Sequence, residues 1–401
     1  MPIPPPIRPL AAILLVMTAL AAPGANALDQ PVTADQAWRH GIPTDPHFFP
    51  IAVWLQSPGN AAAYKAAGIN LYVGLWEGPT EAQLKDLAAA GMLVMCAQNP
   101  VGLAHLDDRT IVGWTQEDEP DNAQAKTGGG YGPPIAPAEI VKLYAALKAK
   151  DATRPVFLNL GQGTAFTGYI GRGTRTGHDE DYTAYAAGGD ILSFDIYPVN
   201  SAEKAVSGKL EYLITGIERL RAAGGGRKPV WCWIETTLIG KDAPAKPTPE
   251  QVRSEVWLAL IHGATGIGYF CHSWNPLFDE AGPLHDPLML AALTTLNQQI
   301  RTLAPMLNSP LAVAGASVTT EDPQAPIALL AKRVGRETCL FAGATRAQAT
   351  TARFTLPVDT VPAGGSVEVI GEERTIPLSG RTFSDHFAAY GVHLYRVMGK
   401  P

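Results

Sequence analysis

The amino-acid sequence predicts an α/β protein: a (β/α)8 TIM barrel followed by a small C-terminal antiparallel β-sandwich. From residue 50 onward, apolar runs alternate with longer segments of helical period, and eight such strand-then-helix units follow one another before residue 307. The runs are apolar along their whole length, as in parallel strands that helices cover. After Leu307, short runs of alternating polarity separated by turn residues replace this pattern.

The eight units occupy about 250 residues, the usual size of a closed (β/α)8 barrel. The third unit has no convincing helix after its strand. An open doubly wound sheet is the alternative fold, but it often carries a Gly-rich phosphate turn after its first strand, and here "WLQSPGN" stands instead. The predicted strands are 51–56, 69–76, 92–99, 110–120, 155–160, 190–198, 229–235 and 266–274.

The N-terminus has the pattern of a secretory signal peptide. Arg8 precedes an apolar run from Leu10 to Ala22, and the small-residue sequence "ANA" ends at Ala27. The run is short for a membrane span, so a single N-terminal anchor is the weaker alternative. We therefore expect a secreted or periplasmic protein cleaved near Ala27, with no membrane span in the mature chain. The expected domains are a signal peptide at 1–27, a barrel at 28–307 and a β-sandwich at 308–401.

The composition is that of a packed globular protein, with 46% hydrophobic residues and a net charge of −6. No basic run indicates binding to nucleic acid or to an anionic membrane surface. The spacing of the four cysteines does not fit a zinc site, and three of them lie in apolar strand-like runs. We expect buried free thiols rather than disulfides, no metal site and no cofactor.

Barrel active sites form at the C-terminal ends of the strands, so the last residues of each predicted strand are the candidate site. They are polar, acidic or aromatic, and no Ser-His-Asp elbow, phosphate-binding loop or His/Cys metal spacing competes with them. The candidate binding and catalytic residues at these ends are Gln56, Trp76, Glu77, Asp118, Glu119, Asn159, Tyr197, Glu235, His272 and Trp274.

Two glutamates stand out because they end the fourth and seventh strands, on opposite sides of an eight-stranded ring. Glu119 lies in "GWTQEDEPDN", where four carboxylates fall within five positions, and Glu235 lies in "VWCWIETT". Cleavage of a glycosidic bond uses two carboxyl groups, one of which donates a proton while the other attacks the anomeric carbon or activates water. The sequence predicts this pair as the catalytic residues.

At these positions, residues 48–305 resemble the large clan of retaining glycoside hydrolases with (β/α)8 barrels. The resemblance implies that Glu119 is the acid/base and Glu235 the nucleophile. It also implies that Tyr197 in "SFDIYP" hydrogen-bonds the nucleophile and that Trp274 in "CHSW" forms the floor of the sugar site. The clan usually has Asn before the acid/base, but this chain has Asp118, which puts the group held at the sugar's 2-position in doubt.

The expected function is therefore an exported glycoside hydrolase that cleaves an oligo- or polysaccharide by a retaining double displacement. One alternative is a non-catalytic carbohydrate-binding barrel of the cell envelope, which would keep the polar rim and Trp274 without needing both glutamates. The other is a transglycosidase, which uses the same carboxylates and differs in how well its acceptor site excludes water.

Overall fold

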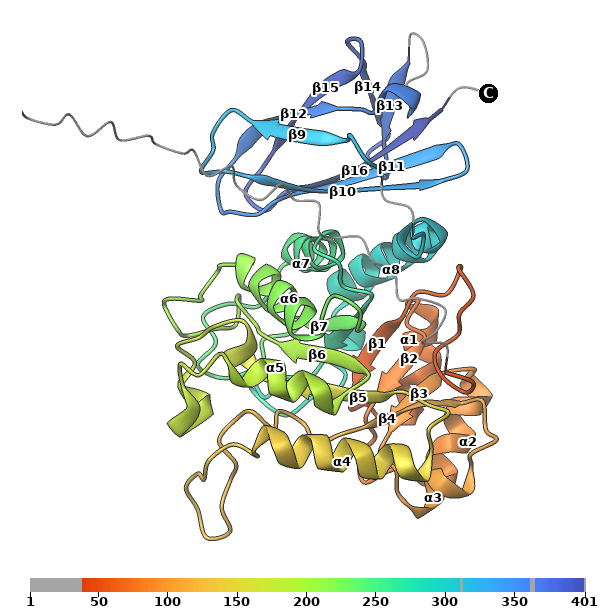
Figure 1. Cartoon of the computed structure of the whole chain (residues 1–401), viewed down its shortest axis with the longest axis vertical. Coiled ribbons are helices and arrows are strands. Elements are labelled where there is room, and N and C mark those ends of the chain that lie inside the picture. The colour runs from red at the N-terminus through yellow and green to blue at the C-terminus, as the bar shows by residue number, and fades with distance from the viewer. Residues whose placement is uncertain (1–37, 311–312, 361–364, 400–401) are drawn as a thin grey trace, which may run out of the picture.

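The computed structural model of the chain describes residues 38–310, 313–360 and 365–399. Within these ranges, the first eight strands form a closed parallel barrel in the order β1 to β8 (Figure 1), which confirms the predicted barrel. The predicted signal peptide at 1–27 lies outside the described residues. The strands are β1 (Ile51–Trp54), β2 (Leu71–Val73), β3 (Leu93–Cys96), β4 (Ile111–Thr115), β5 (Val156–Leu160), β6 (Ile191–Asp195), β7 (Val230–Glu235) and β8 (Gly266–Phe270).

Several strands end before the residues expected to end them. Strand β4 stops at Thr115, so Glu119 lies in the loop that follows, and Trp76, Tyr197 and Trp274 are also loop residues. The helices are α1 (Ala61–Ala66), α2 (Glu81–Ala90), α3 (Pro100–Ala104), α4 (Pro137–Lys150), α5 (Asp181–Tyr185), α6 (Glu211–Ala223), α7 (Pro249–Ile261) and α8 (Pro287–Leu307). The third unit does contain a helix, but α3 has only five residues.

The interior of the barrel is filled by two tryptophans of β7 that face glycines of β8. Trp231 pairs in register with Gly266, and Trp233 pairs with Gly268. A Cβ atom on either glycine would lie 2.5 Å from the ring of Trp231 or 2.0 Å from the ring of Trp233. Phe157 of β5 packs edge-on against both indole rings, at centroid distances of 5.4 and 6.2 Å. The barrel therefore has a packed core, and its accessible end is the mouth above these rings.

The C-terminal part is an antiparallel β-sandwich, as predicted. One sheet has the order β10-β11-β16-β13-β14 and the other β15-β12-β9. Phe354, Phe383 and Tyr395 pack between them. The strands are β9 (Ser317–Thr320), β10 (Ile327–Val334), β11 (Glu337–Ala344), β12 (Thr350–Thr355), β13 (Ser366–Val369), β14 (Arg374–Pro377), β15 (Thr382–Phe387) and β16 (Val392–Met398).

The sandwich packs against the outer helices α7 and α8, on the side away from α3 and α4 (Figure 1). Trp257 of α7 stacks on Phe341 of β11 with a centroid distance of 5.6 Å. Arg253 Nη1 of α7 donates to the carbonyl oxygen of Val392 at 2.9 Å. These contacts join α7 to β11 and β16, so the sandwich supports the barrel wall.

All four cysteines are buried and free, which confirms the expectation of unpaired thiols. Over the described ranges, no helix combines the length and the apolar character that a bilayer crossing requires. The described residues also contain no cluster of three or more His, Cys, Asp or Glu side chains arranged to hold a metal ion.

The packing of Trp233 against Gly268 predicts a specific cost for a methyl group at that position. Gly268→Ala places Cβ inside the indole ring, so we expect the free energy of unfolding to fall by about 1–3 kcal/mol, as in other overpacked cores. Urea unfolding followed by fluorescence measures the change. Gly59→Ala is the matched control, because a Cβ there has no neighbour within 4 Å. Equal stability of the two variants would contradict the proposed packing.

Candidate active site

Glu119 lies on a bulged loop that stays in register with β5. Beyond the end of β4, the amide of Gln116 donates to the carbonyl of Phe157 at 3.0 Å and the amide of Glu119 donates to that of Asn159 at 3.2 Å. The step from Gln116 to Glu119 is three residues, whereas the step from Phe157 to Asn159 on β5 is two. The segment after β4 therefore carries one extra residue, which bulges out of the hydrogen-bonded pairing with β5. Glu119 adopts a left-handed conformation with φ of 43°, which is uncommon for a residue other than glycine.

Asp118, next to Glu119, is tied to the barrel core by Asn159. The Nδ2 atom of Asn159 donates to Asp118 Oδ1 at 2.9 Å, while its Oδ1 accepts from Ser193 Oγ at 2.7 Å and from Trp233 Nε1 at 3.0 Å. These bonds fix the orientation of the amide. Asn159 was predicted to bind substrate, but its side chain is buried and both of its polar atoms are already bonded. It therefore positions Asp118 instead.

Glu119 contacts a third carboxyl group, that of Asp195 at the end of β6. Asn122 Nδ2 donates to Glu119 Oε2 at 2.8 Å from the other side. Asp195 is 6% exposed, and within the described ranges its Oδ1 receives no hydrogen bond from an N–H or O–H donor. Asp195 did not figure among the predicted site residues, although it stands two positions before Tyr197 at a strand end.

The electrostatics of this cluster follow from crowding of negative charge. The pKa of Asp118 is raised to about 7, first by desolvation and then by the negative charge of Glu119. The Asp118 side chain keeps exposed surface, while its Oδ1 accepts a hydrogen bond from Asn159. The pKa of Asp195 is raised well above the usual range, first by burial and then by the charge and hydrogen bond of Glu119. The cluster therefore holds protons that separate carboxyl groups would have lost.

Aromatic side chains line the side of the mouth formed by the loops after β2 and β8. We call this set the aromatic wall; its members are Trp76, Tyr197, Phe270, His272 and Trp274. Trp76 and Trp274 are 40% and 49% exposed, consistent with their predicted place at the rim. Trp76 stacks on His272, and the ring of Phe270 lies between those of Trp274 and Tyr197, 6.0 and 5.1 Å away. Exposed aromatic faces of this kind offer an apolar surface to a sugar ring.

A pocket of 540 Å³ opens between the loops that follow β6, β7 and β8. Tyr197 and Trp274 line it, together with Gln162 and the segment 239–243. The pKa of Tyr197 is raised, first by burial and then by the charges of Asp195 and Glu119. Tyr197 therefore lies between the pocket and the carboxylate cluster, which makes the two parts of one site.

Glu235 does not face an open mouth opposite Glu119, contrary to the prediction. Its side chain is 0% exposed and is turned toward the loop after β6. Oε1 accepts from the amide of Val199 at 2.6 Å, and Oε2 accepts from the amide and from Nδ2 of Asn200 at 2.8 and 2.5 Å. Its carboxyl group also contacts Glu255 of α7. In this conformation Glu235 is bonded to the loop that lines the pocket and has no exposed surface.

Two further predictions of substrate-binding residues are wrong. Gln56 is fully buried, where its Nε2 donates to the carbonyl of Glu280 and its Oε1 accepts from Tyr64 at 2.7 Å. His272 is also buried, and its Nε2 donates to the carbonyl of Leu55 at 3.0 Å. Burial lowers the pKa of His272, so the ring is neutral. Glu77 is exposed beside Trp76, as a rim residue should be.

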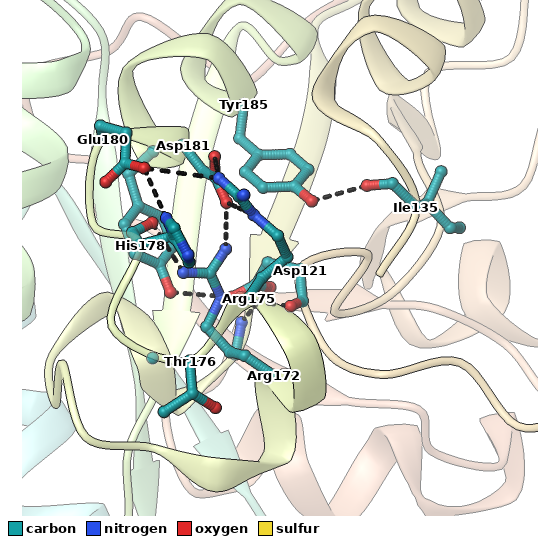
Figure 2. A network of polar contacts seen from close by, with 12 residues as sticks. Asp121, Ile135, Arg172, Arg175, Thr176, His178, Glu180, Asp181 and Tyr185 are labelled. Atoms are coloured by element: carbon teal, nitrogen blue, oxygen red, sulfur yellow. Dashed lines mark hydrogen bonds and ion pairs between the residues drawn. The ribbon is translucent and has the colours of Figure 1, made fainter. Parts of the chain in front are cut away.

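A network of polar contacts joins Asp121, two residues after Glu119, to Arg172, Arg175 and Asp181 (Figure 2). Asp121 is fully buried, and it accepts hydrogen bonds from the amide of Gly161 at 2.8 Å and from the Tyr182 hydroxyl at 3.0 Å. Arg172 lies 4.0 Å from the Asp121 carboxylate and pairs with Asp181 at 2.7 Å. Sequence reasoning missed these residues, because their partners come from loops that only the fold brings together.

We expect removal of the two arginines of this network to lower the free energy of unfolding by different amounts. Arg172 is buried, so Arg172→Met leaves Asp121 and Asp181 with less compensation, and we expect unfolding free energy to fall by about 3–5 kcal/mol. Arg175 also pairs with Asp181 but is more exposed to solvent, so Arg175→Met should cost much less than Arg172→Met. Urea unfolding of both variants measures the difference. A larger loss for Arg175→Met would show that the buried pair does not anchor the loop.

Comparisons with known proteins show likeness in fold alone. No family model matches the chain, and no curated protein matches it. Solved structures with a similar fold include a GH30 endoxylanase from Clostridium papyrosolvens C71 at 13% identity, covering 88% of this chain and 96% of that chain, with a TM-score of 0.48. An alpha-amylase from Geobacillus thermoleovorans, at 10% identity, covers 91% and 100%, with a TM-score of 0.43. Such distant likeness assigns no catalytic residue, so function has to be argued from this chain's own site.

Proposed function

We propose that the protein is a glycoside hydrolase that acts on an oligo- or polysaccharide by a retaining double displacement. The observation that carries this proposal is the contact between Glu119 and Asp195 at the open end of the barrel, beside the aromatic wall. One carboxyl group of such a pair can donate a proton while the other stays ionised. The wall and the pocket offer the surfaces that a sugar ring needs.

The close approach of the two carboxyl groups favours the retaining mechanism. Retaining glycosidases hold their carboxyl groups ~5–5.5 Å apart, whereas inverting enzymes keep them ~6.5–9.5 Å apart to admit a water molecule. Glu119 and Asp195 are in hydrogen-bond contact, so no water fits between them. The contact is therefore nearer to the retaining separation than to the inverting one.

The two other functions make different demands on the same site. A carbohydrate-binding barrel needs the aromatic wall to hold a sugar. It does not need two carboxyl groups side by side, because their contact raises the pKa of Asp195 and adds no bond to the sugar. A transglycosidase would use the same pair with a second sugar as acceptor. Analysis of transfer products at high acceptor concentration separates it from a hydrolase.

Hydrolysis of a panel of aryl pyranosides and furanosides, together with polysaccharides, tests the proposal. We expect the wild type to release the product from at least one substrate, and Glu119→Gln to lower kcat by about 10²- to 10⁴-fold, because it removes an ionisable group from the reaction. Glu117→Gln is the matched control from the same loop, because Glu117 is exposed and outside the pair. Binding of a glycan by the wild type without cleavage would favour the binding barrel.

We further propose that the protein is exported and that residues 1–27 are removed. The support is the sequence pattern of Arg8, the apolar run that follows it and the "ANA" ending at Ala27. Expression in a bacterial host, followed by intact-mass measurement of the periplasmic fraction and the medium, should give a chain beginning near Leu28. A chain that lacks 1–27 should stay in the cytoplasm. Recovery of the full-length chain in the membrane fraction would favour the N-terminal anchor instead.

A further inference from the structure

Phe278 is an exposed aromatic residue next to the aromatic wall, and the pocket does not use it. It lies in the loop after β8, and 53% of its side chain is exposed. Its ring contacts those of Trp274, His272 and Trp76 at centroid distances of 5.6, 5.7 and 6.3 Å. Phe278 therefore joins the two exposed tryptophans of the wall into one surface.

The aromatic rings form a continuous row that begins in the pocket. Tyr197 and Trp274 line the pocket, whereas Trp76 and Phe278 are not among the described residues that line it. Ring contacts lead from Tyr197 through Phe270 to Trp274, and then through Phe278 to Trp76. A sugar ring held in the pocket thus has a second aromatic surface beside it, which consists of Trp76 and Phe278. We call these two residues the outer platform.

Trp76 is exposed, yet it is held from several sides. Gln83 Nε2 donates to its backbone carbonyl at 2.8 Å, and its indole Nε1 donates to Glu280 Oε2 at 2.9 Å. The indole stacks on His272 with 20° between the ring planes, and His272 is itself bonded to the carbonyl of Leu55. Fixing an exposed side chain costs conformational entropy. A ring held in this way is typical of a binding surface that is organised before the ligand arrives.

Glu280 fixes Trp76 by joining three loops of the barrel mouth. Besides the indole of Trp76, its carboxylate accepts from Asn60 Nδ2 at 3.1 Å, and its backbone carbonyl accepts from Gln56 Nε2. Asn60 follows β1, Trp76 follows β2 and Glu280 follows β8. Glu280 is partly exposed, and a carboxylate has more acceptor sites than these two donors use. It can therefore also accept a hydrogen bond from a sugar hydroxyl at the edge of the outer platform.

The backbone next to Trp76 is strained. Glu77 has a φ of 49°, in the left-handed region that residues other than glycine seldom adopt. Such conformations cost free energy and cluster at sites that bind ligands. The side chain of Glu77 is exposed, so a second carboxylate lies beside the outer platform.

We propose that the outer platform is a second sugar-binding subsite, so that the substrate is a chain of sugar units rather than a glycoside of one sugar. One unit lies in the pocket against Tyr197 and Trp274, and a further unit lies on Trp76 and Phe278. This inference rests on the proposed glycoside hydrolase function for the bond that is cleaved, and it adds the length of the substrate.

A sugar chain fits this surface better than a second protein does. A stable interface between proteins takes about 20–30 residues from each partner. The exposed apolar side chains in these two loops are only Trp76, Trp274, Leu277 and Phe278. Sugar rings carry apolar faces and hydroxyl groups, so they suit exposed aromatic rings that have carboxylates beside them.

Hydrolysis of substrates of different length tests the inference. The substrates are 4-nitrophenyl glycosides with one to six units of the sugar that the panel of glycosides and polysaccharides identifies. We expect wild-type kcat/KM to rise about tenfold or more from one unit to six. Phe278→Ala should lower the ratio of the six-unit to the one-unit value by about tenfold. The loss should fall on KM, because contacts far from the cleaved bond stabilise ground state and transition state alike.

Three further variants control this experiment. Leu277→Ala should keep the wild-type ratio, because Leu277 is 79% exposed in the same loop and has no ring. Phe278→Tyr keeps the ring and should keep the ratio, whereas Trp76→Phe, which cannot donate to Glu280, should lower it. Urea unfolding shows whether each variant is folded. Losses that are equal at every chain length, or as large in Leu277→Ala, would overturn the inference and leave the proposed function intact.

Sedimentation velocity tests the other occupant of this surface, a second copy of the chain. We expect wild type and Phe278→Ala to sediment alike. A wild-type dimer that dissociates in Phe278→Ala would overturn the inference, because the outer platform would then be an interface between copies.

Calorimetric titration with cello-, xylo- and maltohexaose separates the inference from the proposed function. If the wild type cleaves nothing but binds one hexaose, and Phe278→Ala weakens that binding about tenfold, the subsite is real and the proposed function is wrong. If the wild type cleaves a substrate and chain length does not change kcat/KM, the function stands and the subsite is wrong. If it neither cleaves nor binds any glycan, both are wrong.

Discussion

The buried carboxylate of Asp121 is the interaction on which the rest of the site depends. A charged group with no exposed surface is stable in a protein only when donors surround it, and Asp121 takes them from Gly161 and Tyr182, beside Arg172. These partners belong to the loop after β5 and to α5, so one side chain joins three segments. Glu119 stands two residues before Asp121. Its unusual left-handed backbone persists because this anchor and the hydrogen bond to the Asn159 carbonyl hold the chain on both sides.

The polar site is also connected to the apolar core below it. Trp233 fills the barrel only because Gly268 of the neighbouring strand leaves room for its ring. Its indole N–H must then find an acceptor inside the barrel, and it finds Asn159, which in turn donates to Asp118. The packing of one tryptophan thus sets the orientation of a carboxylate at the mouth, with a single amide side chain between them.

The sequence predicted the barrel, the sandwich and the exposed rim residues, because apolar runs and helical period report the burial of whole elements. It failed at individual side chains one or two residues past a strand end. Leu55 takes a positive φ of 45°, which breaks the alternation and lets Gln56 reach Tyr64. Glu235 is captured by the amides of Val199 and Asn200, a loop whose path no local pattern encodes. Asp195 was overlooked for the same reason, since its contact with Glu119 exists only after the barrel closes.

The crowding of negative charge in "GWTQEDEP" and the residues after it now has a physical explanation. Glu117 faces solvent, Asp118 is bonded to Asn159, Glu119 is bonded to Asn122, and Asp121 is bonded to Gly161 and Tyr182. Each of these acids, apart from the solvent-exposed Glu117, has a hydrogen-bond donor of its own. Asp195 adds a further carboxyl group beside Glu119; its Oδ1 has no hydrogen-bond partner within the described ranges, and its pKa is raised by burial and by the charge of Glu119. The raised pKa values of Asp118 and Asp195 follow from burial and from this crowding, and carboxyl groups perturbed in this way are typical of functional sites.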